Sequence, residues 1–139
     1  MSRLLVLLCA GLLLAAFSTN DALAQKKKIE ITKKWSGSVA DEKASKPAVI
    51  TSAKGLEKVW KEWKAEGEVP KVDFDKNIIV TAYTVGSLLN VNAVNLDDNG
   101  NLTVLAIATR DFRPGFRYVL AVVRKDGVKT VEGKALPKE

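Results

Sequence analysis

The sequence has 139 residues and a formal net charge of +6, and 47% of its residues are hydrophobic. It contains no histidine and a single cysteine, Cys9. The lack of a second cysteine excludes an intramolecular disulfide and a zinc–thiolate centre, and the lack of histidine excludes catalysis with histidine as the general base. We therefore expect neither a metal nor another cofactor. The positive charge favours anionic partners.

Residues 1–24 have the pattern of a secretory signal peptide. Arg3 precedes a mostly apolar run at 4–17, and Ala22-Leu23-Ala24 matches an A-x-A cleavage site. The run is shorter than the roughly 20 residues that a membrane-spanning helix needs. We predict cleavage after Ala24, a periplasmic or secreted protein and no transmembrane anchor; retention of the signal as an anchor is the alternative. Nucleic acid is a poor candidate partner for an exported protein.

Residues 25–47 form a basic N-terminal arm that is rich in lysine. Residues 28–35 alternate between polar and apolar types, as in a half-buried edge strand whose lysines discourage further pairing. Because such charge runs are usually solvated, we expect the arm to be partly disordered and residues 36–47 to form a loop. The arm and residues 48–139 are predicted to form a single domain.

Residues 52–66 are predicted to form an amphipathic helix. Ser52 is a suitable N-cap, and Gly67 is expected to close the helix with a positive φ. Four apolar side chains recur on one helical face: Leu56, Val59, Trp60 and Trp63. This spacing favours core packing of the two tryptophans over an aromatic ligand box.

Six further segments are predicted to be strands: 48–51, 78–85, 91–96, 102–109, 116–124 and 128–132. The dipeptides Asn99-Gly100 and Asp126-Gly127 predict tight turns, and residues 134–139 read as a polar tail. Hairpins that follow one helix indicate an α+β fold. We expect a mainly antiparallel sheet, curled into a partial barrel or a sandwich, with the helix packed on it.

Arginine is concentrated in one stretch of the chain. After the signal, all four arginines lie within 15 residues of sequence: Arg110, Arg113, Arg117 and Arg124. The guanidinium group binds carboxylate or phosphate with two parallel hydrogen bonds, which lysine cannot do. The candidate binding residues in the loop 110–118 are Arg110, Phe112, Arg113 and Arg117. The alternative is that Arg110 pairs with Asp111 or another carboxylate and that the phenylalanines belong to the core.

No catalytic constellation is visible, and we predict a protein that is not an enzyme. Ser87 is the one candidate nucleophile, but no G-x-S-x-G motif surrounds it. Residues 97–101 match the first positions of a calcium loop. Leu102 and Ala108, however, stand where that loop has glycine and glutamate, so an ordinary hairpin is favoured.

Several features of residues 48–132 occur in a recognisable order. Trp60 lies on the predicted helix, Val72-Asp73-Phe74 follows Pro70, and the strand at 78–85 precedes the later hairpins. In this order the chain resembles the C-terminal domain of PrcB-type proteins, which are stability factors of a protease complex in bacterial envelopes. It departs from that family at residues 87–90, where we would expect a glycine-rich turn, so no role of that loop is carried over. The resemblance implies a non-enzymatic envelope protein that binds or stabilises a partner.

The leading functional hypothesis is an exported, non-enzymatic module that contacts or stabilises another envelope or secreted protein through residues 110–118. The alternative is a protein that binds a small anionic ligand or an anionic polymer through the same arginines. The two hypotheses differ in salt dependence, because exposed charge contacts are screened within about 8–10 Å at physiological ionic strength.

Overall fold

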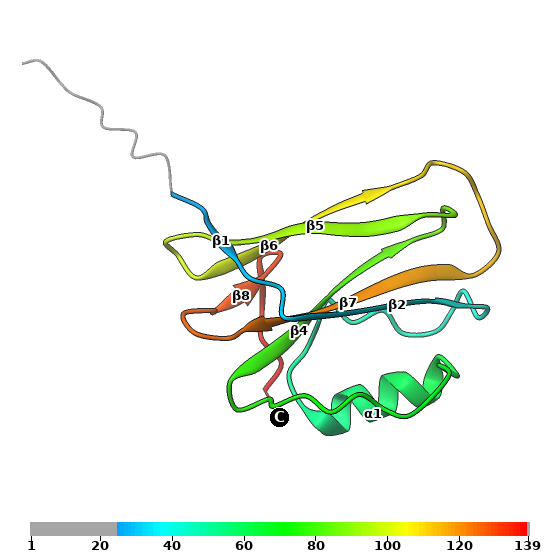
Figure 1. The fold of residues 1–139 in the computed structure, drawn as a ribbon, viewed down its shortest axis with the longest axis horizontal. Helices are drawn as coiled ribbons and strands as arrows, with labels where there is room; N and C mark the ends of the chain where they lie inside the picture. Colours follow the sequence, from blue (N-terminus) through cyan, green and yellow to red (C-terminus); the bar gives the residue numbers. More distant parts are fainter. Residues whose placement is uncertain (1–24, 139) are drawn as a thin grey trace, which may run out of the picture.

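The structure, a computed structural model, describes residues 25–138. The predicted signal peptide, residues 1–24, lies outside them. The described chain forms two β-sheets and one helix, arranged in three layers (Figure 1). The elements are β1 (Lys27–Ile29), β2 (Lys33–Val39), β3 (Val49–Ile50), α1 (Ala53–Glu62), β4 (Asn77–Thr84), β5 (Leu89–Leu96), β6 (Asn101–Ala108), β7 (Phe116–Arg124), β8 (Thr130–Val131) and β9 (Lys134–Ala135).

The two sheets pack face to face and neither closes on itself. The first sheet has the strand order β1-β5-β6-β8-β9, and the second has the order β2-β7-β4-β3. All neighbouring strands are antiparallel except β6 and β8. The predicted α+β class is therefore confirmed, and of the two expected architectures the sandwich is the one observed.

The core between the sheets is built from β4 and β7 of the second sheet and from β5, β6 and β8 of the first. Alternate residues of a strand point to opposite faces, so Val119, Ala121 and Val123 of β7 face the first sheet. Their partners include Val80 of β4 and Val94 of β5, both fully buried. Residues 77–84 thus form the central strand that their apolar, β-branched composition predicts.

The helix covers the other face of the second sheet. Ser52 caps its N-terminus, as predicted, with its hydroxyl accepting a hydrogen bond from the Gly55 amide at 2.9 Å. Trp63 is only 3% exposed. Its ring centroid lies 4.5–5.9 Å from those of three aromatic residues on β4 and β7: Tyr83, Phe116 and Tyr118. Core packing of the tryptophans is thus confirmed, and aromatic contacts of this kind add to the area that they bury.

The helix ends earlier than predicted, at Glu62 rather than residue 66. Lys64 adopts a left-handed conformation with φ of 51°. Its backbone amide donates a hydrogen bond to the Lys61 carbonyl, and the Ala65 amide donates one to the Trp60 carbonyl. These two bonds form a Schellman motif, which satisfies the last carbonyls of a helix. Lys64 therefore takes the capping position that we assigned to Gly67.

The N-terminal arm also differs from the prediction. It is not one edge strand with a disordered start, because β1 pairs with β5 in the first sheet and β2 pairs with β7 in the second. Residues 30–32 carry the chain from one sheet to the other, and the Thr32 amide donates to the Val122 carbonyl at 3.0 Å. Strand β2 continues to Val39, so the loop that we expected at residues 36–47 begins four residues later than predicted. Trp35 and Val39 pack on the helix side of the sheet, which explains the extension.

The C-terminal segment needs a further correction. The predicted last strand at 128–132 is reduced to β8, which pairs in parallel with the first two residues of β6. Glu132 and Gly133 both have positive φ, and this tight turn places β9 inside the predicted tail, antiparallel to β8. Within residues 25–138, no helix combines the length and the apolar character required to cross a bilayer.

Candidate functional site

The structure divides the four predicted site residues between two environments. Arg110, Phe112 and Arg113 lie in the exposed connection between β6 and β7, whereas Arg117 lies within β7. The predicted loop 110–118 therefore ends at residue 115, where β7 is about to begin. Phe112 is 74% exposed, while Phe116 is 1% exposed and belongs to the core. The alternative that both phenylalanines are core residues thus holds for only one of them.

Asp111 anchors this loop to the turn that precedes β5. One carboxylate oxygen accepts hydrogen bonds from the Thr109 hydroxyl, from the Ser87 amide at 2.8 Å and from the Ser87 hydroxyl at 3.0 Å. The other oxygen accepts from Nε of Arg113 at 3.3 Å. The Thr109 hydroxyl and the two Ser87 donors hold the pKa of Asp111 well below its usual range.

The carboxylate partner expected for Arg110 is therefore taken by Arg113. Arg110 forms no salt bridge with any residue in the described part of the chain. Ser87, which we rejected as a nucleophile, donates its hydroxyl to Asp111 and lies 3.2 Å from the Thr109 hydroxyl. This arrangement makes Ser87 part of the loop anchor.

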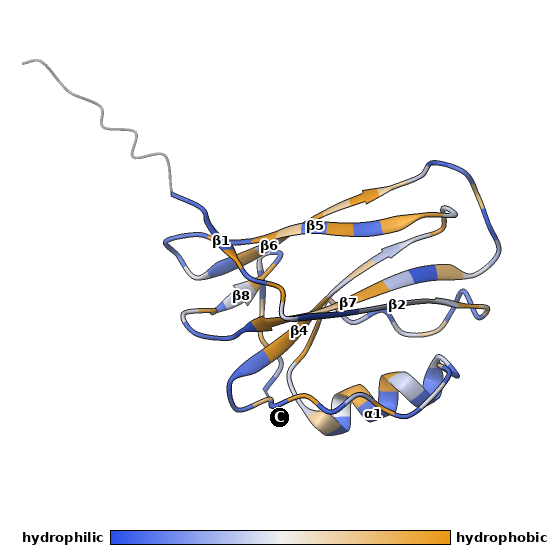
Figure 2. Ribbon diagram, in the orientation of Figure 1, coloured by the Kyte–Doolittle hydropathy of each residue, from blue (hydrophilic) through white to orange (hydrophobic). Residues whose placement is uncertain are grey.

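Five large apolar side chains are exposed among residues 25–138, and all come from segments at one end of the sandwich. They are Val85 (47% exposed), Leu88 (68%), Leu105 (50%), Ile107 (64%) and Phe112 (74%). Two precede β5, two lie on the outer half of β6 and one is in the β6–β7 loop. Figure 2 shows that this half of β6 is coloured as hydrophobic although no other layer covers it. A contiguous exposed apolar surface on a globular protein is typical of an interaction site.

The same half of β6 presents an open backbone edge. Strand β8 covers only Asn101 and Leu102, and beyond it the Glu132 carboxylate accepts a hydrogen bond from the Val104 amide at 2.5 Å. The Thr109 amide, in contrast, donates toward β5, to the Leu88 carbonyl. Because backbone groups alternate sides along a strand, the N–H and C=O of Ala106 point to the open side.

We call residues 104–108 with Leu88 and Phe112 the apolar edge. No residue in 103–108 carries a charge or is proline. Exposed edge strands usually carry such residues because they prevent further strand pairing. The apolar edge has neither of these protections, so it is open to an additional strand.

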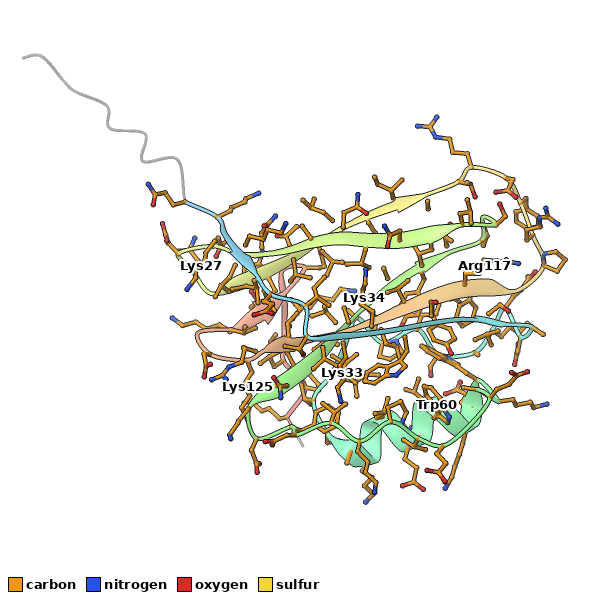
Figure 3. All side chains as sticks on the ribbon, in the orientation of Figure 1. Lys27, Lys33, Lys34, Trp60, Arg117 and Lys125 are labelled. Carbon is orange, nitrogen blue, oxygen red and sulfur yellow. The ribbon has the colours of Figure 1, made fainter. Side chains whose placement is uncertain are left out.

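Arg117 occupies a separate small pocket. Its cross-strand neighbours are Ser38 of β2 and Thr84 of β4. Because side chains alternate along a strand, that of Arg117 lies on the face of β7 that is turned toward the first sheet (Figure 3). The pocket has a volume of about 290 Å³, and its lining includes Ser36, Ser38, Ser87, Leu88, Leu89 and Arg117. The Nη1 atom of Arg117 is buried and has no hydrogen-bond partner among residues 25–138. An unpaired buried polar atom of this kind is uncommon.

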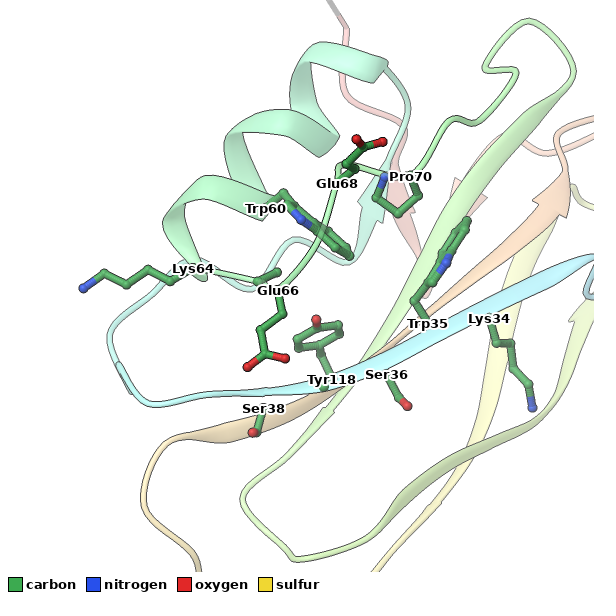
Figure 4. Close-up of a pocket in the computed structure, with 12 residues that line it drawn as sticks. Lys34, Trp35, Ser36, Ser38, Trp60, Lys64, Glu66, Glu68, Pro70 and Tyr118 are labelled. Carbon is green, nitrogen blue, oxygen red and sulfur yellow. The ribbon is translucent and has the colours of Figure 1, made fainter.

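A larger groove of about 650 Å³ lies on the opposite side of β2. Figure 4 shows Trp35, Trp60, Pro70 and Tyr118 around it, with Glu68 above and Glu66 to the left, while Ser36 and Ser38 point away from it. The indole N–H of Trp60 is satisfied by the Gly67 carbonyl at 3.2 Å. This groove is therefore an aromatic hollow whose charged lining residues have both signs, Lys34 and Lys64 as well as Glu66 and Glu68. Trp60 is one of the two tryptophans for which we considered an aromatic ligand box; the other, Trp63, belongs to the core.

Comparisons of the chain with known protein families, with curated proteins and with solved structures found no match. The resemblance of residues 48–132 to PrcB-type proteins therefore stays a prediction. The candidate sites are those that the geometry itself provides: the apolar edge, the Arg117 pocket and the aromatic groove.

Proposed function

We propose that this protein is an exported, non-enzymatic binding module that receives an extended segment of another envelope or secreted protein along the apolar edge. The observation that carries the proposal is the exposure of Leu105 and Ile107 beside an open strand edge. Burying the part of each side chain that is still exposed would contribute roughly 1–2 kcal/mol, since complete burial of an exposed side chain contributes roughly 1.5–3 kcal/mol.

Addition of a β-strand suits this surface better than docking of a helix. The outward N–H and C=O of Ala106 would form main-chain hydrogen bonds with an added strand, which supply affinity independent of sequence. Leu105 and Ile107 share one face of β6, because they are two residues apart. An added strand would therefore place alternate apolar side chains next to them.

The charge of the loop defines a second property of the partner segment. Arg110 lies two residues after the end of β6 and has no carboxylate partner among the described residues. A protein with a net charge of +6 also attracts acidic partners over longer distances. We therefore expect an extended apolar segment that carries an acidic residue at the end nearest Arg110.

Export is supported by the signal-peptide pattern of residues 1–24. Binding without catalysis is supported by the role of Ser87 as a donor to Asp111 and by the lack of histidine. A protein-stabilising role would also agree with the family that residues 48–132 resemble.

The proposal is tested by a photo-crosslinking side chain at position 107, with the protein exported in its native host. Mass spectrometry identifies the crosslinked segment, and a synthetic peptide of that segment is then titrated into the purified protein. We expect Leu105→Lys and Ala106→Pro each to weaken binding by roughly tenfold or more, because one removes apolar contact and the other removes the outward N–H.

Asn99→Lys is the matched control, since it adds the same charge at the exposed opposite end of the same hairpin. It should leave the affinity unchanged. Equal binding of the peptide to the Leu105→Lys variant and to the unchanged protein would overturn the proposal. So would crosslinking of position 107 only to a second copy of this chain, which would make the apolar edge a dimer interface.

A further inference from the structure

We propose that the Arg117 pocket is a binding site for the carboxylate group of a small ligand with an apolar body. This inference is independent of the apolar edge as a strand-binding surface. No residue of β6 lines the pocket, although Leu88 borders both surfaces. The candidate site lies between the sheets, at the end where β5 begins.

The first argument is the charge of Arg117. The guanidinium remains charged under all physiological conditions, and removing a charge from water is costly unless a counter-charge or hydrogen bonds compensate. Arg117 has no salt bridge to any residue that the structure describes, and its Nη1 atom is buried without a partner. Arg113 and Arg124 are paired with Asp111 and Asp126, and Arg110, which has no such partner among the described residues, lies in an exposed loop. Among the arginines of residues 25–138, Arg117 is thus the half-buried one that lacks a carboxylate partner, and a bound anion would provide the missing counter-charge.

The second argument is the set of additional donors. Ser36 and Ser38 are two residues apart on β2, so both hydroxyls lie on the pocket side of the strand (Figure 4). Ser38 is the direct cross-strand neighbour of Arg117. The Ser87 hydroxyl is already used by Asp111. The two serine hydroxyls and the guanidinium nitrogens of Arg117 other than the covered Nη1 have no hydrogen-bond partner among residues 25–138, so they can donate to both oxygens of a carboxylate.

The third argument is the apolar part of the lining. Leu88 and Leu89 form one wall of the pocket, opposite the serines of β2. A cavity of about 290 Å³ is at the small end of the range for ligand sites. These walls suit a short hydrocarbon chain attached to the carboxylate, whereas a phosphate ion would leave the leucines without contact.

The probe for this site is hexanoate, titrated into isotopically labelled protein and followed by NMR, including the side-chain Nε–Hε signal of Arg117. We expect saturable shifts at Arg117, Ser36, Ser38, Leu88 and Leu89. Hexanol has the same chain length without the carboxylate and should bind at least roughly tenfold more weakly, the loss typical of a charged hydrogen bond. Inorganic phosphate tests the rival anion and should also bind more weakly than hexanoate.

Two variants separate the pocket from general attraction to a basic protein. Arg117→Met should weaken hexanoate binding by roughly tenfold or more, while Arg124→Met removes the same charge from the exposed end of β7 and should leave hexanoate binding unchanged. The shift pattern in the unchanged protein provides a test that needs no variant. Equal binding of hexanol and hexanoate, tighter binding of phosphate, or shifts confined to the aromatic groove would each overturn the inference. Loss of binding in both variants would do the same, because it would indicate nonspecific attraction.

Discussion

Tyr118 of β7 lies across Gly37, its cross-strand neighbour on β2. A Cβ atom on Gly37 would stand 2.6 Å from the Tyr118 hydroxyl oxygen and 2.8 Å from the ring carbon that bears it. The tyrosine can therefore occupy this position only because residue 37 has no side chain. Tyr118 in turn packs on Trp63 of the helix layer, with 4.5 Å between ring centroids.

We predict that Gly37→Ala displaces the Tyr118 ring and lowers the free energy of unfolding by about 1–3 kcal/mol, the usual cost of overfilling a packed site. Urea denaturation would measure this loss, and near-ultraviolet circular dichroism would report the changed aromatic packing. Ser36→Ala is the control on the same strand and should change stability by no more than about 0.5 kcal/mol. Unchanged stability in Gly37→Ala would show that Tyr118 moves aside freely.

Tyr83 should make the protein sensitive to alkaline pH. Its hydroxyl donates to the Pro47 carbonyl at 2.6 Å, and burial raises its pKa above the ordinary value. The unfolded chain loses this proton near pH 10, whereas the folded chain keeps it to higher pH. The contribution of Tyr83 to stability is therefore complete below pH 10 and is lost above it, by up to about 1.4 kcal/mol per pH unit.

Denaturation curves between pH 8 and pH 11 test this prediction. Tyr83→Phe should flatten the decline above pH 10, and it leaves no orphaned acceptor because the Thr81 hydroxyl also donates to the Pro47 carbonyl. Burial raises the pKa of Tyr118 as well, so a smaller decline should persist in the variant. An identical decline in both proteins would assign the alkaline sensitivity to other groups.

The fold was largely predictable because its main elements follow local periodicity. The helical spacing of Leu56, Val59 and Trp60 identified both the helix and its buried face, and the apolar runs at 78–85 and 116–124 identified the two central strands. The predictions that were wrong concern features that depend on contacts between segments far apart in the sequence. The division of the arm into β1 and β2 is decided by where β5 and β7 lie, and these strands follow it by more than 50 residues.

The candidate site was predictable only in part, for a related reason. Residues 102–109 are apolar at nearly every position, and this composition predicts burial. Half of the strand is exposed because no other layer covers the outer face of the first sheet there, and its backbone edge is open because β8 pairs with only two of its residues. No local pattern encodes either feature. For Arg117 a signal was present: it alternates in phase with Val119 and Ala121, which indicates the inter-sheet face rather than a solvent-exposed loop.

Asp111 should control the conformation of the loop that bears Arg110 and Phe112. We predict that Asp111→Asn speeds hydrogen exchange at the Ser87 amide, because the loss of charge weakens all the hydrogen bonds at that carboxylate. Since the folded-state pKa of Asp111 is depressed, the anchor is intact above pH 4. It is lost as the pH falls through the lowered pKa.

The control for this prediction is Asp126→Asn, which breaks the exposed pair of Asp126 with Arg124 near the turn that follows β7. It should leave exchange at Ser87 unchanged. The measurement is amide exchange by NMR, in both variants, at one neutral pH and at a series of acidic pH values. Equal protection of Ser87 in the Asp111→Asn variant would show that backbone contacts alone hold the loop.

The unpaired charge of Arg117 leads to a prediction about stability in the absence of any ligand. Arg117 is half-buried, and its Nη1 atom is buried without a hydrogen-bond partner among residues 25–138. Withdrawing part of a charge from water in this way opposes folding, and replacing buried charged groups by apolar ones of similar size is often neutral or stabilising. We predict that Arg117→Met raises the free energy of unfolding by about 1 kcal/mol in buffer without carboxylates. Arg110→Met should change it by no more than about 0.5 kcal/mol, because Arg110 is exposed.

Urea denaturation of the three proteins in chloride and in hexanoate tests this prediction, since a bound carboxylate should stabilise the unchanged protein but not the Arg117→Met variant. If Arg117→Met is instead destabilised in both media, the arginine has a structural role and the pocket is not kept for a ligand.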